Sequence, residues 1–395
     1  MTALVRNQLI PLLNATDAAN DPNVGLLMQR GLRAWPISDK EKKDKKDLIE
    51  VITDTKSSSL YQLAFDRWLL QTQQREFFTT TCATIDGRLM TGLALGGTLE
   101  TGVTTQHSYG MPMLAGSSVK GAVRAYAENL FSKKDTEGKV ILKKDEKGIE
   151  RTSIEDAMQP ILEILFGTDE DAEQVNAGYL VWHDAWLIPA LTKEGNYSNS
   201  DDAKPFVEEI VTVHHPRYYA DTKGEVEPLD IESPVPNQQL AVQGSFYFVI
   251  EGANKQWLDF AKQLLDNMLI QFGLGAKAAS GYGYFKQDIA LNSKLDSHFR
   301  AINVEHIDPN DEYGIARQKM SGYNEVQLYE ALAKSGRTKS FTEFNLDKTN
   351  EEHCRKVVEI ALELHCSWID SEDWKDSKKK TIAEALKFIN NYKVL

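Results

Sequence analysis

Between residues 76 and 287 the sequence alternates between strand-like and helix-like segments, and the order of these segments limits the folds open to the chain. Runs rich in β-branched and aromatic residues predict strands, and apolar residues at helical spacing predict helices. The predicted elements are a strand at 76–84, a helix within 114–130, strands at 178–187 and 245–251, a helix at 257–272 and a strand at 282–287. The order strand, helix, strand, strand, helix, strand is that of the ferredoxin-like fold, also called RRM-like or split βαβ. We therefore expect an α+β protein built on the βαββαβ order.

Two long insertions and two helical ends surround this pattern. The insertions, at about 131–177 and 189–244, exceed ordinary connections, and segments of such length usually carry function or are disordered. Residues 1–75 and 291–395 show apolar residues at helical spacing instead. We expect a helical N-terminal extension at 1–75, a ferredoxin-like domain at 76–290 and a helical C-terminal extension at 291–395.

Composition excludes several classes of protein. The chain has 395 residues, 42% of them hydrophobic, which is enough for a sizeable core. Its three cysteines cannot form a disulfide framework, and no apolar run approaches the roughly 20 residues of a membrane span. Secreted and membrane-embedded classes are therefore excluded, and we expect a cytoplasmic protein without membrane contact.

The net charge of −13 argues against a protein that coats nucleic acid nonspecifically, but this charge is unevenly spread. The segment from Glu128 to Glu209 has nine basic and nineteen acidic residues, so it carries −10 of the total. The segments 101–127 and 273–286 have two basic residues each and no acidic residue. These two segments can therefore bind an anion despite the acidic whole.

A glycine-rich loop at 272–284 joins the second predicted helix to the last predicted strand. Its glycines free backbone N–H groups and allow positive φ angles, so the loop can bind phosphate, with Lys277 adding charge and Ser280 a donor. The loop lacks the Gly-Lys-Ser/Thr ending of a Walker loop. It also leads from a helix into a strand, the reverse of a dinucleotide-binding turn. A structural turn without a ligand is the alternative.

The start of the first predicted helix offers a second anion site. Ser117 or Ser118 is the expected N-cap, and exposed amides at a helix N-terminus favour an anion. Lys120 and Arg124 are four residues apart and share one helix face. Gly121 weakens a helix, so we expect close packing there. The alternative is a serine cap beside solvated basic side chains.

The second insertion holds a histidine pair followed by an arginine and two tyrosines. These residues are His214, His215, Arg217, Tyr218 and Tyr219. Aromatic rings and a guanidinium are the groups that stack on unpaired bases or on a distorted duplex. A metal site would need convergent carboxylates, which the spacing does not indicate.

No residue pattern predicts catalysis or a cofactor. His353 and His365 each precede a cysteine, but the two pairs are twelve residues apart and cannot converge on one ion from a single helix. We expect these cysteines to pack. His183 and Asp184 are neighbours in a predicted strand, so their side chains point to opposite faces and form no dyad. We expect no metal, no cofactor and no catalytic residue.

Several motifs together resemble the RAMP superfamily of CRISPR RNA-binding proteins over about residues 77–287. They are the Gly-Ser-Ser-Val-Lys-Gly-Ala-Val-Arg helix start at 116–124, a strand carrying Asp184-Ala185, and the glycine loop at 273–283. Further motifs, at 99–102, 107–110, 213–219 and 228–236, are similar to the family of the sixth subunit of the Cmr complex, the type III-B effector. The two helical ends carry no matching motif.

This resemblance implies a non-catalytic subunit that binds RNA. Members of the family cap the backbone filament of the effector where it holds the 3′ part of the guide RNA, beside the last backbone subunit and the first Cmr subunit. Carried over by motif, the RNA-binding residues would be Gly116, Ser117, Ser118, Lys120, Arg124, Gly273, Gly275, Lys277, Ser280, Gly281, Tyr282, Gly283, His107, Tyr109, His214, His215, Arg217, Tyr218 and Tyr219. The insertion around His214 would resemble a thumb hairpin that wedges into the guide–target duplex. Guide RNA, target RNA and other Cmr subunits would be the partners, in antiviral defence.

Two other functions stay open. A RAMP endoribonuclease would use an aspartate after the first strand, for which Asp86 is the nearest candidate, with His107 as the general acid or base. A scaffold that touches only proteins would need neither residue.

Overall fold

The computed structural model describes residues 2–3, 6, 8, 11, 21–32, 34–35, 43–73, 76–93, 99–144, 148–168, 175–213, 215–227, 235–305, 313–364 and 379–392. The chain forms two compact units, Met1–Ser293 and Lys294–Leu395. Each unit has its own hydrophobic core.

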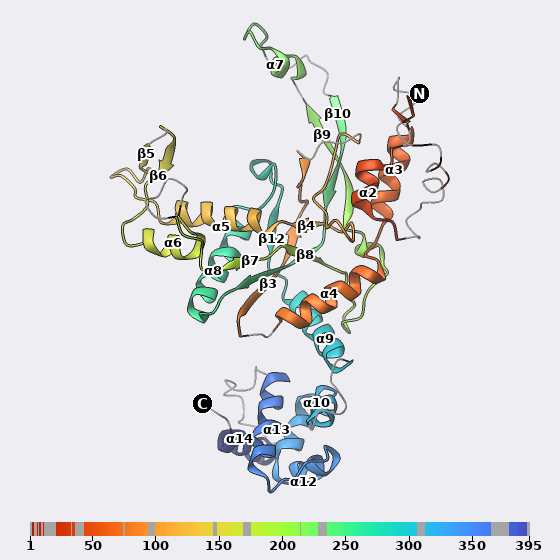
Figure 1. Cartoon of the computed structure of the whole chain (residues 1–395), viewed down its shortest axis with the longest axis vertical. Helices are drawn as coiled ribbons and strands as arrows, with labels where there is room; N and C mark the ends of the chain where they lie inside the picture. The colour runs from red at the N-terminus through yellow and green to blue at the C-terminus, as the bar shows by residue number, and fades with distance from the viewer. Residues whose placement is uncertain are drawn as a thin grey trace. The chain divides into compact units, whose positions relative to one another are not determined.

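An antiparallel sheet organises the first unit (Figure 1). Its strands lie in the order β12 (Tyr284–Lys286), β3 (Phe78–Asp86), β11 (Ser245–Glu251), β8 (Ala185–Ile188) and β4 (Met113–Leu114), and β7 (Val181–Trp182) also pairs with β11. The last predicted strand thus lies beside the first, and the second beside the third. With α5 (Gly116–Leu130) and α8 (Lys255–Gln271) in the expected places, this arrangement confirms the ferredoxin-like α+β fold.

The predicted strand at 178–187 is in fact two short strands, separated by His183 and Asp184. Both side chains make contacts of their own at this break. His183 Nε2 lies 2.8 Å from Glu251 Oε2, and Asp184 Oδ1 accepts a 2.7 Å hydrogen bond from the Gly116 N–H. The interruption therefore places a carboxylate at the start of α5.

Alternate side chains of β11 enter two different layers. The rings of Phe246 and Phe248 lie 6.3 and 5.8 Å from the ring of Phe285 in β12. They belong to the same buried cluster as the apolar face of α8, which packs against β3, β11 and β12. Tyr247, between the two phenylalanines, points to the other face of the sheet.

Helix α4 (Ser59–Thr72) covers that other face. The Tyr61 O–H donates a 2.6 Å hydrogen bond to the Leu187 carbonyl, and Thr72 Oγ1 lies 3.0 Å from the Tyr247 hydroxyl. Both contacts are buried. The sheet therefore has helices on both faces instead of one open face.

The remaining N-terminal elements are β1 (Thr2–Ala3), α2 (Val24–Arg30), β2 (Ala34–Trp35) and α3 (Lys43–Asp54). Apolar side chains of α2 and α3 join the same core as the sheet; they include Val24, Leu27, Ile49 and Ile52. The described residues before 75 therefore complete the core of the first unit.

The insertions fold into hairpins and short helices. The first holds β5 (Leu142–Lys144), β6 (Glu150–Thr152) and α6 (Gln159–Phe166); the second holds η5 (Asp201–Ala203), β9 (Phe206–Val213), α7 (Pro216–Ala220) and β10 (Val235–Val242). Strands β9 and β10 pair antiparallel over their whole length and project from the sheet, with α7 at the tip (Figure 1).

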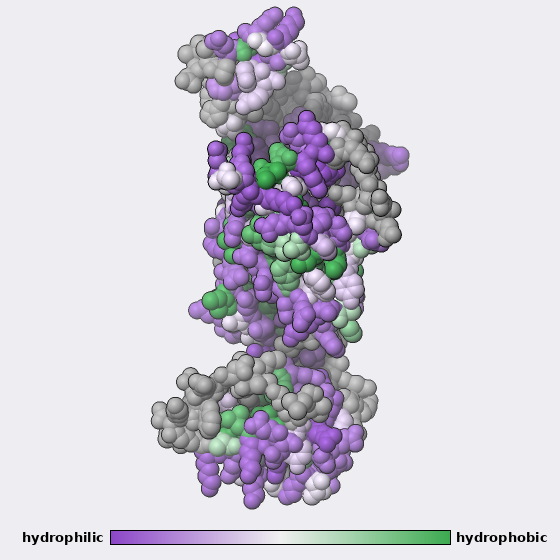
Figure 2. All heavy atoms as spheres, turned by 90° about the vertical axis from the view of Figure 1, so that its left-hand side faces the viewer, coloured by the Kyte–Doolittle hydropathy of each residue, from purple (hydrophilic) through white to green (hydrophobic). Residues whose placement is uncertain are grey.

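Exposed apolar side chains gather around the first insertion. They include Leu130, Ile164, Tyr179 and Val181, which are 39–52% exposed. Figure 2 shows this side of the unit, with apolar residues in green among hydrophilic residues in purple. Apolar side chains grouped on a surface are typical of protein-contact sites.

The second unit is helical. Helix α9 (Ile289–Glu305) runs across the boundary, followed by α10 (Gly314–Ser321), α11 (Glu325–Leu332), α12 (Lys334–Glu343), α13 (Glu351–Leu364) and α14 (Lys379–Tyr392). Cys354 is 1% exposed in the core of this unit, so its predicted packing is confirmed. His365 and Cys366 lie outside the described residues.

Among the described residues, no group of three or more His, Cys, Asp or Glu side chains is placed to hold a metal ion. No helix in the described parts of the chain combines the length and apolar character that a membrane crossing requires.

Candidate nucleic-acid interface

The glycine loop between α8 and β12 takes a conformation that other residues adopt only with strain. Its four glycines and Lys277 all have positive φ angles, between 61° and 102°. A Cβ on Gly283 would lie 2.0 Å from the Leu274 carbonyl oxygen, and one on Gly275 would lie 2.5 Å from the Met90 oxygen. Glycine is therefore required at these two positions both by φ and by space.

One part of the loop is fixed by hydrogen bonds to the protein. The Leu274 N–H donates to Gly283 O, and the Gly283 N–H donates to Arg88 O, each at 2.8 Å. The Ala276 N–H donates to Met90 O at 2.7 Å. These bonds, together with the short η6 helix (Ala278–Ser280), give the loop a single shape.

Another part of the loop offers donors to solvent. Within the described residues, four backbone N–H groups of the loop have no hydrogen-bond partner: those of Gly275, Lys277, Ala278 and Ala279. The side chains of Lys277 and Ser280 are exposed, and Lys277 makes no ion pair with any described residue. Backbone donors beside a lone ammonium match the requirements of a phosphate group.

Helix α5 begins two or three residues earlier than expected, and its cap differs from the prediction. The N-cap is Ala115, with no side-chain hydrogen bond, so the expectation of a cap at Ser117 or Ser118 is wrong. The capping acceptor is Asp184, from the break between β7 and β8. A Cβ on Gly116 would lie 2.1 Å from the Trp182 carbonyl oxygen, so this close approach also requires glycine.

We expect Asp184→Ala to lower the free energy of unfolding by about 1 kcal/mol, because it removes the acceptor for an N-terminal N–H of α5 and an anion beside the helix dipole. Thermal unfolding of the full chain measures the change. Asp184→Asn keeps an oxygen acceptor and is expected to lose less. Equal stability of the alanine variant and the parent would contradict the capping role.

The first turns of α5 carry two exposed serines and a half-buried lysine. Ser117 and Ser118 are exposed, and Lys120 forms no ion pair with a described residue. Arg124 Nε, by contrast, lies 2.7 Å from Glu128 Oε1. The prediction of close packing at Gly121 is wrong, since a Cβ there would meet no atom within 4 Å.

An aromatic contact brings α5 to the base of the glycine loop. The rings of Tyr126 and Phe272 meet edge-on with centroids 5.1 Å apart, and the Tyr126 hydroxyl lies 3.4 Å from Gln271 Oε1. Lys120 precedes Tyr126 by six residues, which is about 9 Å along the helix axis. The two predicted anion sites therefore belong to neighbouring elements of one unit.

The glycine loop is also bonded to the projecting hairpin. The Tyr282 O–H donates to Glu209 Oε1 of β9 at 3.3 Å, and Arg88 Nε lies 4.0 Å from Glu209 Oε2. Burial and then the nearby Glu209 carboxylate raise the pKa of Tyr282, which keeps the hydroxyl protonated as a donor. No spacing in the sequence connects residues 73 positions apart, so this link was not predicted.

The tip of the hairpin carries the exposed rings that the sequence predicted. Tyr218 and Tyr219 in α7 are 45% and 75% exposed, and their rings meet edge-on at 5.5 Å. Arg217 is exposed beside them, and His215 is half-buried at the start of α7. His214 lies outside the described residues.

The turn that contains His107 and Tyr109 has a structural role that the sequence did not indicate. The ring of Tyr109 lies 5.8 Å from that of Tyr61 and 6.2 Å from that of Trp186. Asn23 Nδ2 donates to the His107 carbonyl at 3.0 Å. The turn therefore docks α2 and α4 onto the sheet, while the His107 side chain is exposed.

The alternative catalytic aspartate is engaged by a lysine. Asp86 Oδ1, at the end of β3, lies 3.1 Å from Lys286 Nζ across the strand pair, and both side chains are about 60% exposed. An exposed ion pair of this kind is common on sheet surfaces.

A comparison with protein families gives one match. The model of the RAMP superfamily matches residues 83–286, which is slightly more than half of the chain. No curated protein matches the sequence.

Solved structures with similar chains include three from CRISPR systems. A chain of the Type III-B Cmr-beta complex bound to cognate target RNA, solved by cryo-EM, is 19% identical, with 64% of this chain and 77% of that chain covered and a TM-score of 0.41. Cmr6 from Pyrococcus furiosus is 22% identical, with 54% and 98% covered and a TM-score of 0.32. A chain of a CRISPR RNA-guided surveillance complex in a pre-nicking state is 10% identical, with 72% and 88% covered and a TM-score of 0.28.

Proposed function

The chain belongs to the RAMP superfamily, and from this membership we propose that it is a non-catalytic RNA-binding subunit of a type III-B CRISPR (Cmr) effector. In this role it caps the backbone filament near the 3′ part of the guide RNA and supports binding of target RNA in antiviral defence. The motifs at 99–102, 107–110, 213–219 and 228–236, which resemble the sixth Cmr subunit, support the narrower assignment.

The observation that carries the proposal is the set of donors in the glycine loop. The backbone N–H groups of Gly275, Lys277, Ala278 and Ala279 lack partners among the described residues, and the Lys277 side chain beside them is exposed. These donors recognise phosphate oxygens and read no base. A subunit that must accept any guide sequence needs this kind of contact, since base pairing supplies the sequence specificity.

The hairpin supplies a second kind of RNA contact. Its exposed Tyr218 and Tyr219 rings, with Arg217 beside them, suit stacking on splayed bases of a guide–target duplex. Glu209 of the same hairpin bonds to Tyr282 of the glycine loop, which joins the stacking element to the phosphate-binding element.

The small number of cations supports a role within an assembly. Lys120 and Lys277 alone give weak affinity, and several subunits on one RNA bind together much more tightly than each alone. The exposed apolar side chains around the first insertion support contact with neighbouring protein subunits, for which the last backbone subunit and the first Cmr subunit are the proposed partners. The proposed location is the cytoplasm.

A native pull-down of the full chain from its host, with sequencing of the RNA and mass spectrometry of the proteins, tests the proposal. We expect short RNAs that share one repeat-derived 5′ tag and differ downstream, together with several proteins that carry glycine loops of this type. Recovery of the chain without RNA and without such relatives would contradict the proposal.

The same complex decides between the proposed role and the endoribonuclease alternative. If this subunit is non-catalytic, Asp86→Ala leaves every cut in the target RNA unchanged. Loss of one cut in a fully assembled Asp86→Ala complex would instead establish an enzyme.

A further inference from the structure

The β9–β10 hairpin projects from the sheet and is held near its base and, through the hydrogen bond from Tyr282, at Glu209 in β9. Each strand has eight residues, which corresponds to a length of about 26 Å. Phe206, Leu240 and Val242 at the base are fully buried, whereas Ile210, halfway along β9, is 59% exposed. A two-stranded ribbon has little stability of its own, so its contacts with the rest of the unit must set its direction, and those at the base act over its whole length.

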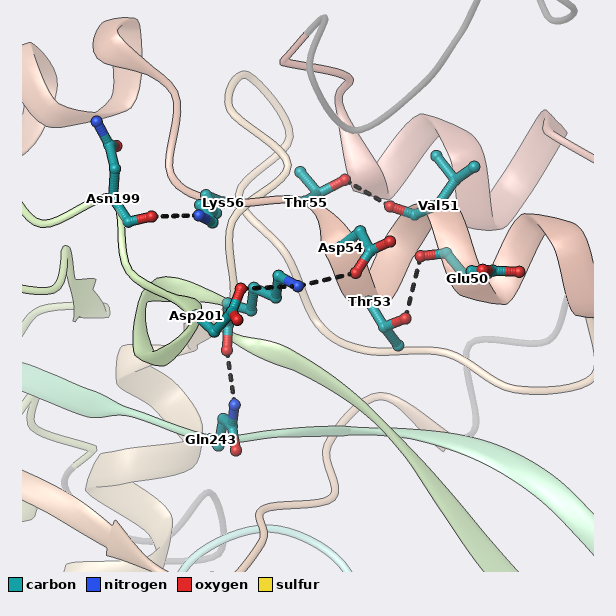
Figure 3. Close-up of polar contacts among 10 residues, drawn as sticks. Glu50, Val51, Thr53, Asp54, Thr55, Lys56, Asn199, Asp201 and Gln243 are labelled. Atoms are coloured by element: carbon teal, nitrogen blue, oxygen red, sulfur yellow. Dashed lines mark hydrogen bonds and ion pairs between the residues drawn. The ribbon is translucent and has the colours of Figure 1, made fainter.

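A lysine between η5 and β9 joins the hairpin base to the N-terminal helices. Lys204 Nζ lies 3.0 Å from Asp54 Oδ1 at the end of α3 and 3.1 Å from Asp201 Oδ1. Its carbonyl accepts a 2.8 Å hydrogen bond from Gln243 Nε2, directly after β10. Figure 3 shows Asp54, Asp201 and Gln243, the three partners, meeting at this junction.

Other contacts at the junction also attach the hairpin base to residues outside the hairpin. Lys56, just after α3, donates to the carbonyl of Asn199 before η5 (Figure 3). Helix α3 also packs against β9. The N–H of Leu240 donates to Thr101 Oγ1 at 2.8 Å on the β10 side. Both strands of the hairpin are thus attached to elements outside it.

The charges at the junction fit a positioning role better than a stabilising one. The hydrogen bonds with Asp54 and Asp201 raise the pKa of Lys204, so the ammonium stays charged at neutral pH. Asp54 and Asp201 are 52% and 89% exposed, and exposed ion pairs contribute little to the free energy of unfolding. What the lysine does provide is a link between two carboxylates on separate elements and the first residues of the hairpin.

We propose that Lys204 is a positioning residue, through which α3 braces the base of the β9–β10 hairpin and fixes the direction of its tip. A rotation of about 10° at the base moves the end of a lever of about 26 Å by about 4 Å. The consequence for RNA rests on the proposed function: without the brace, the rings in α7 no longer meet the duplex at a fixed distance from the glycine loop.

Distances between two spin labels on the full chain test the brace. Labels at Asn237→Cys in β10 and Asp259→Cys in α8, both exposed sites, report the hairpin direction in a chain whose native cysteines are alanine. Asn237 is five residues from the base, about 17 Å, so Lys204→Met is expected to shift or broaden the distance distribution by up to about 3 Å, with the melting temperature nearly unchanged. Lys204→Arg keeps both ion pairs and is expected to keep the narrow distribution.

The matched control is Lys262→Met. Lys262 likewise contacts an aspartate and a second polar group, with Nζ 2.6 Å from Asp266 Oδ2 and 3.5 Å from Thr81 Oγ1, but these lie on α8 and β3. Its distance distribution should equal that of the parent. An unchanged distribution in folded Lys204→Met would overturn the brace. If Lys204→Met does not fold, Asp54→Asn removes the ion pair between Lys204 and α3 through a change at an exposed residue. An unchanged distance distribution in Asp54→Asn would overturn the brace equally.

A second arm separates this inference from the proposed function. In the assembled effector, Lys204→Met is expected to make the boundary between nuclease-protected and cleaved RNA at this subunit less sharp. A shifted hairpin with an unchanged protection boundary would leave the brace standing and contradict the RNA role of the hairpin.

Discussion

Gly283→Ala is expected to lower the free energy of unfolding of the first unit by about 3 kcal/mol or more, measured by urea unfolding with tryptophan fluorescence. The residue has a φ of +77°, and an added Cβ would lie 2.0 Å from the Leu274 carbonyl oxygen. Leu274, which carries that oxygen, also donates its N–H to the Gly283 carbonyl, so its backbone cannot move away cheaply. The loop that presents Lys277 should therefore open or unfold.

Gly281→Ala is the matched control for this change. Gly281 lies two residues away with a similar φ of +89°, but a Cβ there would meet no atom within 4 Å. Only the backbone strain remains, so the expected loss is about 1–2 kcal/mol. Equal losses for the two variants would show that φ alone matters and would contradict the close packing of the loop at Gly283.

The sheet was predictable because its segments obey local rules. The β-branched run in β3 and the run of aromatic and β-branched residues in β11 indicate strands wherever they occur in a chain. The split of the strand at 178–187 was not predictable, since its cause is the contact of Asp184 with Gly116, 68 residues earlier. For the same reason the cap of α5 was assigned to a nearby serine.

The residue types of the candidate site were predictable from the sequence. Which of their groups are engaged by other residues was less predictable. The free amides and exposed Lys277 of the glycine loop follow from its glycines, and the exposed Tyr218 and Tyr219 follow from their place in an insertion. Glu128 follows Arg124 by four residues, a spacing at which opposite charges meet on a helix, so its engagement of Arg124 was readable from the sequence. The packing of the Tyr109 ring on Trp186 was not predictable, because the motif does not indicate which way a turn residue points.

The second large effect concerns RNA. Lys120→Ala/Lys277→Ala is expected to weaken binding of short single-stranded RNA about tenfold at low salt, because it removes two phosphate contacts. Both lysines lack an ion pair with the described residues, so their loss leaves no carboxylate unpaired and the fold is kept. Fluorescence anisotropy with a labelled RNA measures the change, and Lys262→Ala, whose ammonium is held by Asp266, should bind as the parent does.

The salt dependence of RNA binding tests the central claim most directly. The account predicts that the affinity of the full chain for single-stranded RNA falls as salt rises, with a log–log slope that Lys120→Ala/Lys277→Ala makes shallower by about 1.4, or about 0.7 for each lost contact. Tight binding that does not depend on salt, or a slope that the double variant leaves unchanged, would contradict phosphate recognition by the glycine loop and the start of α5.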